Sequence, residues 1–241
     1  MIIIKPDYDC RIEIAGIPDP VRRPVAIDQS RTGFFNLRSL RIYRFDAHSV
    51  VEGHAEEDEV FMVVMAGSVD LAIRDAGSPL DGDAFTLSAP WKGGDVACAA
   101  YLQPGSAYRL TPRTDADVAY ARATPADGPP SRVFCSQPTK SGTEWEILDE
   151  AGYARRLRIR LFHVHAMDVN VTFKPVDASE ASHEALVHVR TAPSDWGCSI
   201  LNGTDVEKLE SWDTLAVAPG ESPLLSVARR SQASALVVSA F

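Results

Sequence analysis

The residues best suited to chemistry lie in one short stretch, GHAEEDEVFMVVMAG at 53–67. There one histidine, His54, precedes four consecutive acids at 56–59, and an apolar run closed by Gly67 follows. Imidazole and carboxylate groups are the usual ligands of zinc, and carboxylate oxygens also suit manganese. Glu52, His54 and Glu59 could therefore form a metal site, or the acids could form a solvated turn before a strand.

A second group of candidates lies in the C-terminal half of the chain. His163 and His165 in FHVHAM form a His-x-His pair, which places both rings on one face of a strand. Glu184 opens the strand-like segment EALVHVR about 20 residues later. His163, His165 and Glu184 are thus a second possible set of zinc or manganese ligands. Glu184 is also the candidate catalytic base, which would move a proton between adjacent carbons beside a metal.

Composition excludes several other functions. The formal net charge of −9 argues against a nucleic-acid partner, because binding to phosphates requires clustered Lys and Arg. No segment approaches the ~20 apolar residues of a membrane-spanning helix. The four cysteines include no CxxC pair and indicate reduced thiols. We therefore expect a cytoplasmic protein with a small-molecule ligand and neither a nucleic-acid nor a membrane partner.

The elements that must position these residues are predicted to be β-strands. Short apolar segments alternate with Pro and Gly along the whole chain, and no window sustains a helical period over several turns. Four prolines between 124 and 138 indicate a connection. Both halves end in a similar strand, Pro-Gly and strand phrase. The sequence thus predicts an all-β protein of two tandem barrels, at 1–125 and 144–241, joined by a linker or crossover at 126–143.

The apolar run Val60–Met65 lacks the alternation of a half-exposed strand. Both of its faces should be covered, one by the barrel core and one by a partner domain or a second subunit, so a homo-oligomer is possible. The acids at 56–59 should form a solvated loop with no ion between them. In that case millimolar zinc, manganese or calcium would barely change the melting temperature.

The pattern His-x4-Glu-x7-Gly at His54, Glu59 and Gly67, followed by a Pro-Gly turn at 104–105, resembles the cupin fold, a double-sheet jelly roll. In that family two histidines, a glutamate and a third histidine hold one metal inside the barrel. Here the position of the third histidine is Tyr108. The resemblance implies that ligands enter one open end of each barrel.

Over nearly its full length the chain resembles the bicupin family of 5-deoxy-glucuronate isomerases, which act in myo-inositol breakdown, and the related uronate ketol-isomerases. The segments that carry this resemblance are MIIIKP, DEVFMVVMAGSVDL, YLQPGSAYRLTPRTDADVAYARA, ARRLRIRLFHV, HEALVHVR, DWGCSIL and WDTLAVAPGESPLL. The resemblance implies an intramolecular oxidoreductase, an aldose-ketose isomerase with zinc in its second barrel.

The zinc ligands of that family fall on Asp177, Ser179, Glu184 and Ser222, of which only Glu184 can act as the family's residue does. We therefore expect an isomerase-like bicupin without the catalytic zinc and with no cofactor, binding a small carbohydrate acid or a similar ligand. The alternatives are an active sugar-acid isomerase with a rebuilt metal site, or a metal-dependent enzyme that uses the N-terminal barrel.

Even without a metal, polar side chains inside each barrel would form a ligand site. The candidates are His54, Glu59, Tyr101 and Tyr108 in the first barrel. In the second barrel they are His163, His165 and Glu184, together with Arg190, whose guanidinium could hold a carboxylate through two hydrogen bonds.

Overall fold

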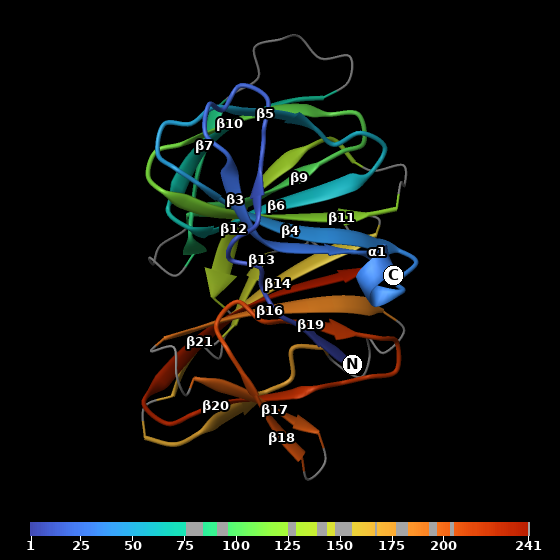
Figure 1. Ribbon diagram of the computed structural model, residues 1–241, viewed down its shortest axis with the longest axis vertical. Helices are drawn as coiled ribbons and strands as arrows, with labels where there is room; N and C mark the ends of the chain where they lie inside the picture. Colours follow the sequence, from blue (N-terminus) through green and yellow to red (C-terminus); the bar gives the residue numbers. More distant parts are fainter. Residues whose placement is uncertain are drawn as a thin grey trace. The chain divides into compact units, whose positions relative to one another are not determined.

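Strands account for nearly all regular structure in the computed structural model, which describes residues 1–75, 84–90, 96–124, 129–138, 144–147, 156–166, 168–176, 183–192, 197–202 and 205–240 (Figure 1). The chain divides into two compact units. The first unit comprises Asp7–Gln137 and Ile147–Leu157, and the second comprises Met1–Pro6, Pro138–Glu146 and Arg158–Phe241. The N-terminal strand β1 thus belongs to the second unit, whereas the boundaries at 125 and 144 that we expected from the sequence stay a prediction.

The first unit is built from two sheets. The strands of the larger sheet follow the order β12-β9-β6-β11-β4-β3-β2, and those of the smaller one follow β5-β10-β7-β8. The elements are β2 (Arg11–Ile12), β3 (Val21–Asp28), α1 (Gln29–Thr32), β4 (Leu37–Phe45), β5 (Val51–His54), β6 (Glu59–Ala66), β7 (Ser68–Arg74), β8 (Ala84–Ser88), β9 (Ala97–Leu102), β10 (Ala107–Pro112), β11 (Ala116–Ala123) and β12 (Arg132–Pro138). β12 lies inside the segment predicted as a linker and pairs with β9.

The core of the first unit fixes which side chains point into the barrel. Alternate residues of a strand point to opposite faces of the sheet. The core includes Val60, Met62 and Val64 of β6, Val51 of β5 and Leu110 of β10. Residues two positions away from these along each strand therefore face the barrel interior, and their sequence neighbours face outward.

Strand β6 is buried on both faces, as the apolar run predicts. Every residue from Glu59 to Met65 is buried. On the outward face, the ring of Phe61 packs against those of Tyr101 and Phe134, with ring centroids 5.5 and 5.6 Å apart. This continuous burial on both faces explains why the sequence of β6 shows no alternation.

The second unit also consists of two sheets. Their strand orders are β1-β19-β16-β21-β14-β13 and β15-β20-β17-β18. The strands are β1 (Ile2–Ile4), β13 (Glu144–Ile147), β14 (Leu157–Ala166), β15 (Val171–Phe173), β16 (Glu184–Ala192), β17 (Cys198–Asn202), β18 (Asp205–Leu209), β19 (Thr214–Val217), β20 (Leu224–Val227) and β21 (Ser231–Ala240).

The core of the second unit contains apolar side chains throughout. Its members include Phe162 and Val164 of β14, Ala185 and Val187 of β16, and Cys198. This parity places His163 of β14 and Glu184 and Arg190 of β16 on the opposite face of the sheet. Within the described ranges, no helix is long and apolar enough to cross a membrane.

Candidate functional site

The register between β5 and β10 determines which predicted residues face the first barrel. Tyr108 pairs with Gly53, and its side chain packs against the barrel core. The predicted inward orientation is therefore correct for Tyr108. Glu52 and His54 flank Gly53 and are exposed on the outer face, where Glu52 forms an ion pair with Arg109 (2.7 Å). The inward orientation that we predicted for His54 is wrong.

Glu59 also faces away from the barrel interior. Its carboxylate is completely buried and accepts hydrogen bonds from the Tyr101 hydroxyl (3.0 Å) and the Arg156 backbone N–H (2.8 Å). Both Glu59 and Tyr101 lie on the outward face, since their neighbours Val60 and Leu102 belong to the core. The predicted inward orientation of these two residues is thus wrong. It could not be read from the sequence, because a strand that is apolar on both faces does not show which residues point into the barrel.

The hydrogen bonds to Glu59 lead to a prediction. Glu59→Ala should lower the free energy of unfolding by about 3 kcal/mol, because it removes the carboxylate that accepts from the buried Tyr101 hydroxyl and from the half-buried Arg156 N–H. Glu57→Ala, a change of the exposed acid two positions earlier, should cost less than about 0.5 kcal/mol. Urea unfolding curves of the two variants measure this difference, and equal effects would contradict a structural role for Glu59.

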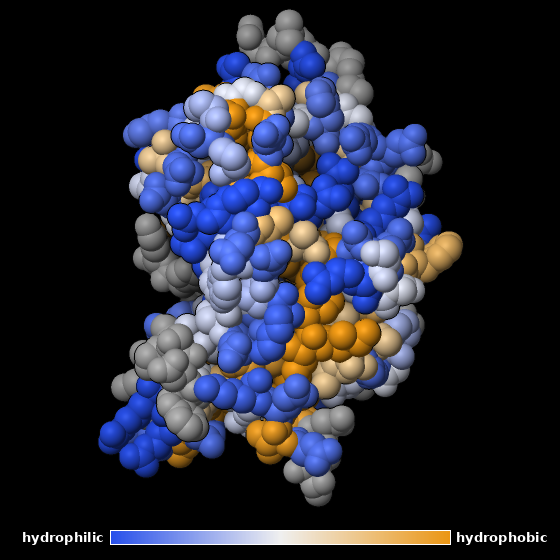
Figure 2. All heavy atoms as spheres, in the orientation of Figure 1, coloured by the Kyte–Doolittle hydropathy of each residue, from blue (hydrophilic) through white to orange (hydrophobic). Residues whose placement is uncertain are grey.

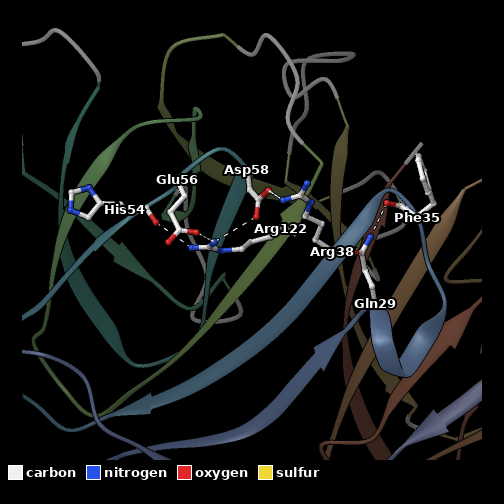
Figure 3. Close-up of polar contacts among 7 residues, drawn as sticks. All are labelled: Gln29, Phe35, Arg38, His54, Glu56, Asp58 and Arg122. Carbon is white, nitrogen blue, oxygen red and sulfur yellow. Dashed lines mark hydrogen bonds and ion pairs between the residues drawn. The ribbon is translucent and has the colours of Figure 1, made fainter.

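The acidic turn is only partly solvated. Glu56 and Glu57 are exposed as expected, but Asp58 is 6% exposed and contacts Arg38 (2.7 Å) and Arg122 (3.6 Å) (Figure 3). Burial raises the pKa of Asp58, and the two guanidinium groups oppose that shift. The expectation of four solvated acids is therefore wrong for Asp58 and Glu59. Asp58 forms ion pairs with two arginines, and Glu59 accepts hydrogen bonds inside the protein.

The predicted metal ligands are not brought together in the first unit. Among the residues that the structure describes, no group of three or more His, Cys, Asp or Glu side chains has the geometry to hold a metal ion. Glu52 and His54 lie on the outer face of the smaller sheet, whereas Glu59 lies in the larger sheet. The residues at these positions thus do not fit the metal of the cupin pattern.

The expectation that added metals have little effect stays a prediction and can be tested directly. Millimolar zinc, manganese or calcium should move the melting temperature by less than about 1 °C. A ligand stabilises the folded state by RT ln(1 + [L]/Kd), which is close to zero when no site binds the metal at millimolar concentration. Differential scanning calorimetry with and without each metal measures the shift. A shift of several degrees that disappears in His54→Ala would reveal a metal site at the acidic turn.

The predicted residues of the second barrel likewise face away from its core. His163, Glu184 and Arg190 alternate with core residues of β14 and β16. The His163 ring shares a hydrogen bond with the Ser234 hydroxyl (2.8 Å), and the guanidinium of Arg190 lies 4.1 Å from the centre of the Trp212 ring. The inward orientation predicted for these three residues is wrong, and their roles in binding or catalysis stay predictions.

The resemblance to the isomerases also placed zinc ligands at Asp177, Ser179 and Ser222. Asp177 and Ser179 lie outside the described residues, as does the side chain of His165. The Ser222 hydroxyl donates to the backbone carbonyl of Val176 (2.9 Å).

A cavity of about 190 Å³ with both polar and apolar walls lies in the first barrel. On the face of the molecule shown in Figure 2, apolar surface is visible between hydrophilic side chains in the upper part of the picture, where Figure 1 labels β3, β5 and β10. The cavity wall combines charged, phenolic and apolar groups. It is lined by Ile12, Ile14, Ser39, Arg41, Tyr43, Phe45, Val51, Glu52, Tyr108, Tyr120 and Arg122.

Three tyrosine rings form one side of this cavity. Tyr43 and Tyr120 meet edge to face with centroids 5.3 Å apart, and Tyr108 lies 6.0 Å from Tyr120. Tyr120 is 5% exposed, and its hydroxyl has no hydrogen bond of acceptable geometry within the described part of the chain, although it lies near Tyr108. Burial, reinforced by Tyr108, raises the pKa of Tyr120 well above its usual value, and burial also raises the pKa of Tyr108. Both phenols are therefore neutral hydrogen-bonding groups at pH 7.

Two arginines extend the polar wall. Arg122 follows Tyr120 by two residues on β11, so both side chains point into the barrel. Its guanidinium donates to the Glu56 carboxylate (3.1 Å) and to the His54 carbonyl (3.2 Å), as Figure 3 shows. Arg41 lies directly opposite Tyr120 in the pairing of β4 with β11. The cavity thus offers cations and phenolic hydroxyls next to apolar side chains.

Of the predicted site residues only Tyr108 and Glu52 line this cavity. Sequence reasoning missed Arg41, Tyr43, Tyr120 and Arg122. The available signal was the alternation SLRIYRF at 39–45, in which polar and aromatic residues share one parity with Phe45 of the core. Glu52 and His54 also border a separate groove of about 410 Å³ on the smaller sheet, next to Arg74 and Arg109.

Comparison with solved structures identifies the fold. An IolB-like protein from Salmonella typhimurium LT2 superposes with a TM-score of 0.66 at 15% identity, over 94% of this chain and 92% of that one. A quercetin 2,3-dioxygenase from Acinetobacter baumannii superposes with a TM-score of 0.62 at 12% identity, over 100% of this chain and 85% of that one. Procruciferin, an 11S globulin from Brassica napus, superposes with a TM-score of 0.63 at 8% identity, over 98% of this chain and 83% of that one. No family model and no curated protein matches the sequence.

These similarities, together with the two-sheet units, show an all-β protein of the cupin, or jelly-roll, fold, as the sequence predicted. They do not select an activity, since the similar structures include a dioxygenase and a globulin. Function must therefore be argued from the residues of the site.

Proposed function

We propose that this cupin protein binds a small organic acid in the cavity of its first barrel. The buried Tyr120 hydroxyl is the observation that carries the proposal. The Tyr120 hydroxyl interacts with the Tyr108 hydroxyl, but no hydrogen bond of good geometry satisfies it within the described part of the chain, and it lines a cavity beside two arginines. A buried hydroxyl left unsatisfied costs about 1–3 kcal/mol. A ligand that hydrogen-bonds to Tyr120 would remove that cost.

Charge complementarity supports an acid as the ligand. Arg41 and Arg122 both line the cavity. Arg122 already pairs with Glu56 and Asp58, whereas Arg41 contacts no carboxylate directly among the described residues and can bind a ligand carboxylate through paired hydrogen bonds. The small carbohydrate acid expected from the sequence falls within this class. Binding here requires no metal, because the cationic and hydrogen-bonding groups belong to the chain. The proposed homo-oligomer and cytoplasmic location stay predictions.

The resemblance to uronate isomerases leaves an active isomerase as the alternative. Aldose-ketose isomerisation needs a base beside the bound sugar acid to move a proton between adjacent carbons. Glu184 lies on the face opposite the core of the second barrel. Among the described residues, Glu52 is the acidic residue that borders the first cavity, and its carboxylate pairs with Arg109 on the outer face. Incubation with 5-deoxy-glucuronate, followed by product analysis, tests this alternative. Turnover that Glu52→Gln abolishes would establish an enzyme that uses the first barrel.

The proposal predicts opposite effects for two Tyr→Phe changes. Tyr120→Phe should raise the free energy of unfolding of the ligand-free protein by about 1 kcal/mol, because it removes a buried hydroxyl that no hydrogen bond of good geometry satisfies among the described residues. Tyr101→Phe should lower it by about 1–2 kcal/mol, because it removes the hydrogen bond to Glu59. Urea unfolding measures both. Destabilisation by Tyr120→Phe would show that the hydroxyl serves the fold and not a ligand.

A further inference from the structure

We infer that the first-barrel cavity selects a small monocarboxylate with a flat, apolar body, and that its carboxylate pairs with Arg41. This inference rests on the proposed function and specifies the ligand class. It depends on the charge balance of the cavity, on the arrangement of its rings and on the character of its wall.

The charge balance leaves Arg41 for the ligand. Arg122 already contacts the carboxylates of Glu56 and Asp58, and the Glu52 carboxylate is paired with Arg109. Hydrogen bonds from Ser30, and to a smaller extent the charge of Arg41, lower the pKa of Asp28. Arg41 itself forms no hydrogen bond or ion pair among the described residues. Among the described residues Arg41 contacts no carboxylate directly and has only the exposed Asp28 carboxylate nearby, so a ligand with one negative charge can pair with it.

The register places Arg41 beside the ring cluster. Arg41 and Tyr120 are directly opposite each other on the same face, which brings their Cβ atoms to about 4.5–5.5 Å. Tyr43 follows Arg41 by two residues, and its ring meets Tyr120 edge to face at 90°. A ligand whose carboxylate binds Arg41 would lie next to Tyr120, and its flat body would pack against the tyrosine rings.

The size and the apolar part of the wall set the rest of the ligand. A cavity of about 190 Å³ admits only a small ligand. Ile12, Ile14, Phe45 and Val51 supply no side-chain hydrogen bonds. The hydroxyls of a sugar acid would lose their water partners against these side chains. An aromatic monocarboxylate of the size of benzoate avoids that loss.

Isothermal titration calorimetry with benzoate, benzyl alcohol and glucuronate tests the inference. Benzoate should bind the wild type more tightly than either of the other two. Arg41→Gln should weaken benzoate about 10- to 100-fold, as expected for loss of a charged hydrogen bond, and should leave benzyl alcohol unchanged. Arg113→Gln is the matched control, because Arg113 pairs with Asp70 and does not line the cavity.

The possible outcomes test the inferred ligand class separately from the proposed function. Tighter binding of glucuronate than of benzoate, or equal benzoate affinity in Arg41→Gln and the wild type, overturns the inference and leaves the proposed function intact. Absence of binding by all three compounds also overturns it, and the stability of Tyr120→Phe then decides the proposed function separately. If Arg41→Gln does not fold, Arg41→Lys serves in its place. Lysine keeps the charge and loses the two-pronged geometry, so benzoate should weaken by about 10-fold.

Discussion

Gly67→Ala is expected to destabilise the first unit by about 3 kcal/mol or more. Gly67 forms the tight turn between β6 and β7 with φ of 75°, a left-handed conformation that costs other residues about 1–2 kcal/mol. An added Cβ would also lie 2.2 Å from the Asp115 carbonyl oxygen and 2.9 Å from the Ala116 Cα. Because both contacts are with backbone, the hairpin must shift, which adds about 1–3 kcal/mol.

Gly33→Ala separates these two contributions. Gly33 ends helix α1 with φ of 71°, and an added Cβ there would meet no atom within 4 Å. Its replacement should cost about 1–2 kcal/mol from the backbone conformation alone. Urea unfolding curves of the two variants provide the comparison. Equal losses of stability would mean that the turn at Gly67 opens without resistance, contrary to the packing seen here.

The buried His188 should make stability strongly dependent on pH. Its ring is 0% exposed and shares a hydrogen bond with the Thr214 hydroxyl (3.1 Å). Burial, assisted by the nearby Arg190 charge, lowers the pKa of His188 from 6.5 to about 3. The imidazole is therefore neutral in the folded protein at pH 5, whereas the unfolded chain takes up a proton below pH 6.5. Stability should fall as pH falls, by about 1.4 kcal/mol per unit between 6.5 and 3.

The contribution of His188 can be isolated between pH 6.5 and 5, above the range in which most carboxylates titrate. Urea unfolding of the wild type should lose about 2 kcal/mol across this window, and His188→Gln should lose much less, because glutamine does not take up the proton. The same slope in both proteins would show that His188 is protonated in the folded state or that another group controls the pH dependence.

The fold could be predicted because it depends on features that a sequence states directly. Short apolar segments separated by Pro and Gly identify strands, and the unbroken apolar run Val60–Met65 correctly indicated burial on both faces. The same run hid the parity of Glu59. When both faces of a strand are apolar, a shift of one residue changes nothing in the pattern but moves the carboxylate to the other face.

The candidate site was harder to predict, since it depends on pairing between strands. Tyr108 was found because the cupin pattern marks its position after the Pro-Gly turn. Arg41 and Tyr120 are about 80 residues apart in sequence and become neighbours only through the register of β4 with β11. In the second unit, the apolar residues that alternate with the predicted site residues along β14 and β16 form the core. The predicted residues with described side chains therefore face the other side of the sheet.

A crystal structure of the protein soaked with benzoate tests the central claim most directly. Our account predicts electron density for the ligand inside the first barrel, in contact with the Tyr120 hydroxyl and the Arg41 guanidinium. An unoccupied cavity together with ligand density in the outer groove beside His54 and Arg109, or in the second unit, would contradict it.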